Sequence, residues 1–185
     1  MIPLPTLTDT LSPITDALDS LTHDQRINWM RGLGRGQLRA LYQLTEGGAP
    51  LSLDHFTGAE GEIVIHYGQN SLPAFTVFQK RVVRRNGGVQ GFNFQTMSPI
   101  TGPGHFTVRQ DGPDVLFDYI ALSADVPEGF PPLQPNDRGL SKLVYGGMID
   151  RVRRVSRHCV IGAAFKGEKA MGAWFMLVRE NPPAP

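Results

Sequence analysis

Two polar residues, His105 and Asp118, are the strongest candidates for acid–base chemistry in this sequence. Asp118 lies in a run with apolar residues on both predicted strand faces, where a carboxylate needs a partner. The dipeptide Asp111-Gly112 predicts a hairpin turn, and a turn centred there places position 105 opposite position 118. A carboxylate beside an imidazole would tune the histidine as a general acid or base. Two structural alternatives stay open: a His–Asp hydrogen bond without catalysis, or an Asp118 that accepts backbone N–H groups at a bulge.

A second candidate is the stretch from Gly91 to Phe106, where phenylalanines alternate with Asn93 and Gln95. If the amides face inward, their spacing allows both to hold a carbonyl or a developing oxyanion, and Tyr119 could bind the same group. The commoner arrangement buries the phenylalanines and leaves the amides in solvent. We predict the first arrangement, with this stretch as one wall and the rim of a ligand cavity and with Asn93, Gln95 and His105 facing in.

Four arginines between positions 151 and 157 form a basic segment. Arg154 and its neighbours could hold a phosphate or carboxylate through bidentate contacts, although such a run is more often a solvated strand edge. The segment supports an alternative function, an interaction protein that meets an anionic partner or surface. Its arginines lack interleaved aromatic residues and the net charge is only +1, which argues against nucleic acid.

Several classes of site have no support in the residue pattern. The five histidines show no metal-ligand spacing, so no metal is expected. A phosphate-binding glycine motif after a strand is absent and Ser71 lacks the second glycine of a nucleophile elbow, so we expect no cofactor and no serine hydrolase. One cysteine, no signal-peptide pattern and no long apolar run predict a cytoplasmic protein without a membrane span.

The elements that position these residues fall into two parts. Residues 1–48 carry helix signals, namely Ser12-Pro13 and a capping box of Thr22 with Gln25, and they predict two or three short helices that form a cap. From residue 62 to 180 the pattern alternates with period two, broken by hairpin dipeptides such as Asn86-Gly87 and by a proline-rich loop over 127–139.

This order predicts a single domain over 1–185, mainly β within the α+β class, in which an antiparallel meander of seven or eight strands closes into a barrel. The outline is similar to lipocalin-like barrels. The sequence therefore predicts a barrel that binds a small, largely apolar ligand, covered by the helices or by the proline-rich loop. On this scaffold a cofactor-independent enzyme would use proton transfer, as an isomerase, cyclase or lyase does. The oligomeric state is left open.

Overall fold

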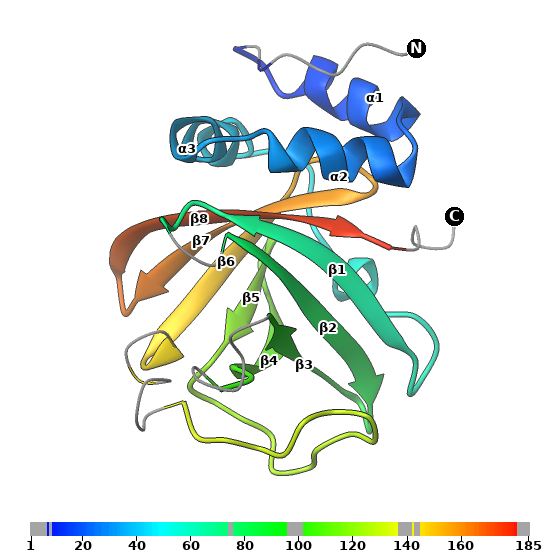
Figure 1. The fold of residues 1–185 in the computed structure, drawn as a ribbon, viewed down its shortest axis with the longest axis vertical. Coiled ribbons are helices and arrows are strands. Elements are labelled where there is room, and N and C mark those ends of the chain that lie inside the picture. Colours follow the sequence, from blue (N-terminus) through cyan, green and yellow to red (C-terminus); the bar gives the residue numbers. More distant parts are fainter. Residues whose placement is uncertain are drawn as a thin grey trace.

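The computed structural model describes residue 7 and residues 9–73, 76–95, 102–136, 142 and 145–180. Within these residues, eight antiparallel strands form a closed barrel in which each strand pairs with the next and the last pairs with the first (Figure 1). The predicted fold class, a mainly β lipocalin-like barrel after N-terminal helices, is confirmed. Closure leaves no strand edge unpaired. The strands are β1 (Ile63–Asn70), β2 (Val77–Arg85), β3 (Gly88–Phe94), β4 (His105–Asp111), β5 (Asp114–Asp118), β6 (Met148–Arg154), β7 (Cys159–Lys166) and β8 (Lys169–Arg179).

Three α-helices precede the barrel in the described chain: α1 (Ser12–Ser20), α2 (His23–Arg31) and α3 (Arg35–Leu44). The predicted capping box begins α2, since the Thr22 N–H donates to Gln25 Oε1 at 2.9 Å and Thr22 Oγ1 accepts the Gln25 N–H. No helix in the described part of the chain is long and apolar enough to cross a bilayer.

The helices lie against the outside of the barrel wall (Figure 1). Leu18 of α1 and Leu41 of α3 are fully buried in one apolar cluster with Ile161 of β7 and Met176 of β8. These strand residues point outward, because their neighbours Val160 and Leu177 belong to the separate cluster inside the barrel. The helices therefore stabilise the wall formed by β7 and β8.

One end of the barrel is closed by the segment around the 3₁₀ helix Leu53–His55. Phe56 is completely buried and packs edge-on against Phe117, with 5.1 Å between ring centroids. The guanidinium of Arg179 holds this segment by donating to the backbone carbonyls of Asp54 and Thr57, each at 2.9 Å, and to that of His55. The barrel interior can therefore be reached by a ligand only away from this end.

Glycines inside the barrel make room for aromatic rings on the neighbouring strand. A Cβ atom at Gly68 would lie 2.5 Å from the ring of Phe78, and one at Gly91 would lie 2.6 Å from the ring of Phe106. Because an eight-stranded barrel is just wide enough to be filled by side chains, each ring needs the space that its glycine partner leaves. The directly paired positions are Gly68 with Phe78, Gly91 with Phe106 and Gly162 with Phe175.

Candidate functional site

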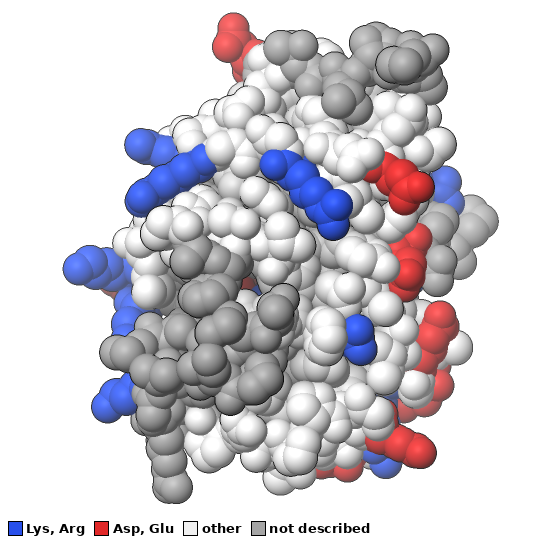
Figure 2. All heavy atoms as spheres, viewed as in Figure 1, with Lys and Arg blue, Asp and Glu red and all other residues white. Residues whose placement is uncertain are grey.

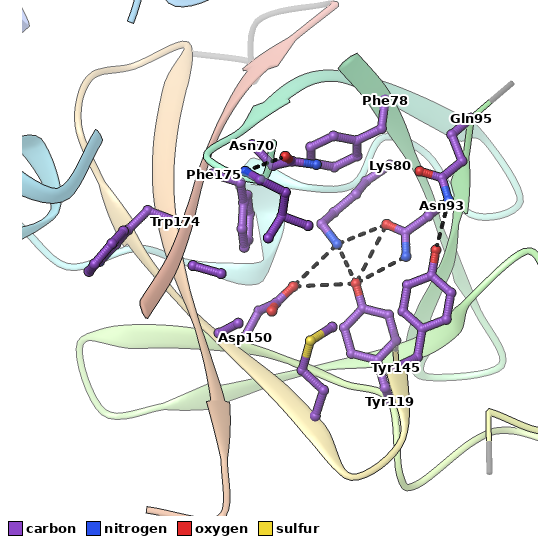
Figure 3. A pocket seen from close by; sticks show the side chains of 14 residues that line it. Asn70, Phe78, Lys80, Asn93, Gln95, Tyr119, Tyr145, Asp150, Trp174 and Phe175 are labelled. Atoms are coloured by element: carbon purple, nitrogen blue, oxygen red, sulfur yellow. Dashed lines mark hydrogen bonds and ion pairs between the residues drawn. The ribbon is translucent and has the colours of Figure 1, made fainter. Parts of the chain in front are cut away.

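A cavity of about 160 Å³ lies inside the barrel, toward the end where β1, β3, β5 and β7 finish (Figure 3). Much of its wall is apolar and includes Phe78, Met148, Ala164, Ala173 and Phe175. None of α1, α2 and α3 contributes a residue to the described lining, so these N-terminal helices do not cover the cavity. Interiors of eight-stranded barrels are known to hold one small ligand, and this cavity has the size for it.

The polar groups of the cavity are joined in one cluster around Lys80 (Figure 3). Its Nζ donates to Asn93 Oδ1 at 2.9 Å, to Tyr119 Oη, and to Asp150 Oδ2 at 3.3 Å. The Tyr119 hydroxyl lies 3.3 Å from Asp150 Oδ2 and 3.1 Å from Asn93 Nδ2. The side chains of Lys80 and Asp150 are only 3% and 4% exposed, so the cluster is screened little by water.

Burial changes the ionisation of all three titratable groups in this cluster. It lowers the pKa of Lys80 to about 8, although Asp150 acts in the opposite direction. Burial raises the pKa of Asp150 against the effect of Lys80, and it raises the pKa of Tyr119 well above its usual value with help from Asp150. At neutral pH roughly a tenth of Lys80 is then a free amine, while Tyr119 stays a hydrogen-bond donor.

Aromatic rings surround the ammonium group where no polar atom does. Lys80 Nζ lies 4.7 Å from the ring centroid of Phe106 and 4.9 Å from that of Phe117. Such cation–π contacts partly offset the cost of desolvating the charge. They also leave the amine in an apolar setting.

Sequence reasoning missed Lys80 and Asp150, although a signal was present. Lys80 stands between Phe78 and Val82 on the inward face of β2, and Asp150 stands between Met148 and Val152 on the corresponding face of β6. A charged residue flanked at i−2 and i+2 by apolar residues is hard to leave in solvent. Asp118 was singled out because apolar residues lie on both faces of its strand, whereas this same-face comparison marks Lys80 and Asp150.

The structure brings three of the predicted ligand-binding residues, Asn93, Gln95 and Tyr119, to the lining of this cavity. Gln95 lies nearer the rim, where its Nε2 donates to Tyr145 Oη at 3.2 Å. The alternating phenylalanines point outward, as the chosen arrangement requires. Phe92 packs against Phe130 of the proline-rich loop, with centroids 4.7 Å apart, and not against the helices.

His105 lies on the outer face of the barrel, and the prediction that it faces the cavity is wrong. It pairs with Phe92 across β3 and β4, and directly paired residues share a face. Its Nε2 lies 3.3 Å from the carbonyl oxygen of Pro132, and its own backbone carbonyl accepts from Asn136 Nδ2 at 2.8 Å. The inward positions on this strand belong to Phe106 and Val108.

The predicted pairing of His105 with Asp118 is also wrong, because Thr107 lies opposite Asp118. Asp111 pairs with Asp114, so the hairpin turns through Gly112-Pro113, later than the centre that the sequence suggested. Asp118 Oδ1 accepts the N–H groups of Ile120 at 2.8 Å and Ala121 at 3.0 Å. This is the backbone-bonded alternative, with Arg109 Nε a further donor at 3.4 Å.

Arg154 is exposed at the end of β6 farthest from the cavity, where it pairs with Val160, so it is not brought together with the other candidates. Two arginines of the basic segment are engaged with acids: Arg151 and Arg153 donate to Asp114 at 3.1 and 3.3 Å. On the face seen in Figure 2, Lys and Arg side chains are separated by uncharged surface and do not gather in one patch.

Among the described residues no three His, Cys, Asp or Glu side chains gather so that they could hold a metal ion.

The fold and the cavity define the class of protein: a closed antiparallel β-barrel with a mainly apolar internal cavity and one buried polar cluster. Comparisons with protein-family models, curated proteins and solved structures found no match.

Proposed function

We propose that the protein binds a small, largely apolar molecule in the barrel cavity and that one polar group of this molecule meets the cluster of Lys80, Asn93, Tyr119 and Asp150. The observation that carries the proposal is the joining of these four side chains in one buried network that lines a mainly apolar cavity. A few convergent polar groups with shifted pKa values in an apolar pocket are typical of a ligand site.

The size of the cavity limits the ligand. A cavity of roughly 150 Å³ holds a molecule about the size of benzene. The present volume of about 160 Å³ therefore suits a compact ring or a short chain. Asn93 and Tyr119 supply a hydrogen-bond donor and an acceptor for a carbonyl or hydroxyl group, and Gln95 at the rim can select what enters.

A cofactor-independent proton transfer on the bound molecule is the second candidate function. It is favoured by the lowered pKa of Lys80, about 8, because a general base works best when its pKa is near the working pH. Lys80 would take the proton and the Tyr119 hydroxyl would hold the carbonyl oxygen. In this proposal Lys80 replaces His105 as the acid–base group and Asp150 replaces Asp118 as its carboxylate partner, while Tyr119 keeps its predicted role.

The test is a titration of short alcohols, ketones and phenols by isothermal calorimetry, with native mass spectrometry to count bound molecules. Ala164 lines the cavity and is paired with Asp150 across β6 and β7, so Ala164→Leu fills the space beside the polar cluster and should weaken binding at least about tenfold. Ala170→Leu is the matched control, since Ala170 is exposed on the next strand. Binding that survives Ala164→Leu unchanged would place the ligand elsewhere and refute the proposal.

A further inference from the structure

Lys80 differs from the other lysines of the chain in its surroundings. The chain has four lysines, and Lys142, Lys166 and Lys169 are exposed. Lys80 is buried and lines the cavity, so a molecule bound there would lie next to its amine. A primary amine in an apolar site, partly unprotonated at neutral pH, is the nucleophile that attacks carbonyl carbons.

The groups around Nζ match the needs of that reaction. Asn93 Nδ2 donates to Tyr119 Oη at 3.1 Å, and Tyr119 Oη donates to Asp150 Oδ2 at 3.3 Å. A bound carbonyl oxygen would take the Tyr119 hydroxyl proton in place of Asp150, which frees the carboxylate. Asp150 Oδ2, 3.3 Å from Nζ, can accept the proton that the nitrogen must lose and can then stand as counter-ion to a cationic product. No group from outside the cluster is required.

Charge balance favours a neutral carbonyl compound over an anion. Lys80 and Asp150 together carry no net charge, and both lie within the same buried cluster. A carboxylate ligand would add an unpaired negative charge to this apolar cavity, which is costly. An aldehyde or ketone enters uncharged.

We propose that Lys80 forms a Schiff base with a small, largely apolar aldehyde or ketone held in the barrel cavity. The proposal rests on the binding function proposed above. The Nζ lone pair forms an N–C bond while the carbonyl π pair moves to oxygen, which takes a proton and gives a carbinolamine. The C–O bond then breaks and one water leaves, so that amine plus carbonyl become imine plus water with no change of oxidation state.

The test uses hexanal with sodium cyanoborohydride, which reduces a Schiff base to a stable secondary amine. The matched proteins are the triple variant Lys142→Arg, Lys166→Arg, Lys169→Arg, in which Lys80 is the only lysine, and the same protein with Lys80→Met. The N-terminal α-amine reacts in both, and peptide mapping separates its adduct from that of Lys80. Intact mass and peptide mapping should show one adduct at Lys80 in the first and none there in the second. In wild type, Lys80 should react at least about tenfold faster than any exposed lysine, because the cavity holds hexanal beside its amine.

Two further readouts make the outcomes distinct. Reaction at Lys80 should rise with pH to a half-point near pH 8, its lowered pKa. Calorimetry of the triple variant with 1-hexanol, which cannot react, reports binding alone, and circular dichroism shows whether Lys80→Met is folded. If hexanol binds but no adduct forms at Lys80, the Schiff base is refuted and the binding function stands. If neither hexanol nor hexanal binds, both proposals fall.

Discussion

Lys80 and Asp150 reach each other across the barrel interior from β2 and β6, strands that do not pair, and their Nζ and Oδ2 atoms lie 3.3 Å apart. Removing two charges from water costs several kcal/mol per ion, which their attraction repays only in part. Apolar residues of similar volume would serve the core as well. Stability alone therefore does not explain the pair, which agrees with the ligand site proposed above.

Breaking this pair should destabilise the protein more than replacing it. Asp150→Ala leaves a buried charge without its partner, and we expect it to lower the free energy of unfolding by about 3–5 kcal/mol. The double variant Lys80→Met, Asp150→Leu should recover most of this loss. Guanidinium unfolding followed by circular dichroism measures both.

The exposed pair of Arg85 and Asp125, 3.8 Å apart, is the control for the buried pair. Asp125→Ala should change the free energy of unfolding by no more than about 1 kcal/mol. A double variant as unstable as Asp150→Ala would show that the ion pair itself is not the origin of the effect.

Acid should destabilise the protein through His66. The ring of His66 is completely buried, neither of its nitrogens has a hydrogen-bond partner among the described residues, and burial, followed by Arg179, lowers its pKa to about 3. Protons then bind the unfolded chain first, so stability is lost as the pH falls from about 6.5 toward 3. Between pH 7 and pH 5 this one histidine accounts for about 2 kcal/mol.

His66→Leu should remove that part of the pH dependence, as urea unfolding at the two pH values would show. His23→Gln, at a half-exposed histidine on α2, serves as control. An unchanged pH dependence in His66→Leu would assign the acid sensitivity to other groups, with the buried His55 next to be tested, since burial and then His66 lower its pKa well below normal.

Replacement by alanine should have opposite effects on the free energy of unfolding at Gly91, which faces a phenylalanine ring, and at Gly36, which lies on a helix surface. A Cβ at Gly91 would lie 2.6 Å from both the Arg81 carbonyl oxygen and the Phe106 ring, so Gly91→Ala should cost about 1–3 kcal/mol of unfolding free energy. Gly36 lies in α3 with open space around it, and Gly36→Ala should stabilise by about 0.5–1 kcal/mol. Thermal unfolding compares them directly, and equal effects would contradict the packing argument.

Cys159 should resist thiol reagents until the protein unfolds. It is fully buried in the cluster between helices and barrel, and burial raises the pKa of its thiol to about 12. Almost no thiolate exists at neutral pH, and the reagent has no path to the sulfur. Ellman's reagent should give one equivalent in guanidinium and almost none in buffer. Fast labelling of the native protein would mean that the helices leave the barrel wall readily.

Local patterns were read correctly from the sequence. The strand alternation, the Thr22–Gln25 capping box and the Asn86-Gly87 hairpin all appear, the last with positive φ at both residues (52° and 74°). Errors came from register. The β4–β5 turn lies one position later in the chain than predicted, so Thr107 and not His105 pairs with Asp118. His105 instead pairs with Phe92, and both side chains point out of the barrel.

The amino-acid sequence by itself determined the short N-terminal helices, the antiparallel meander and the alternation of β3 that puts Asn93 and Phe92 on opposite faces, because alternation, caps and turn residues act over a few positions. Only the tertiary structure decided that Lys80 meets Asp150. Their strands are distant in sequence and are not paired, so no local pattern links them. They meet because the eight strands close into a barrel, and the register of the strands places the inward side chains of β2 and β6 at the same height in the interior.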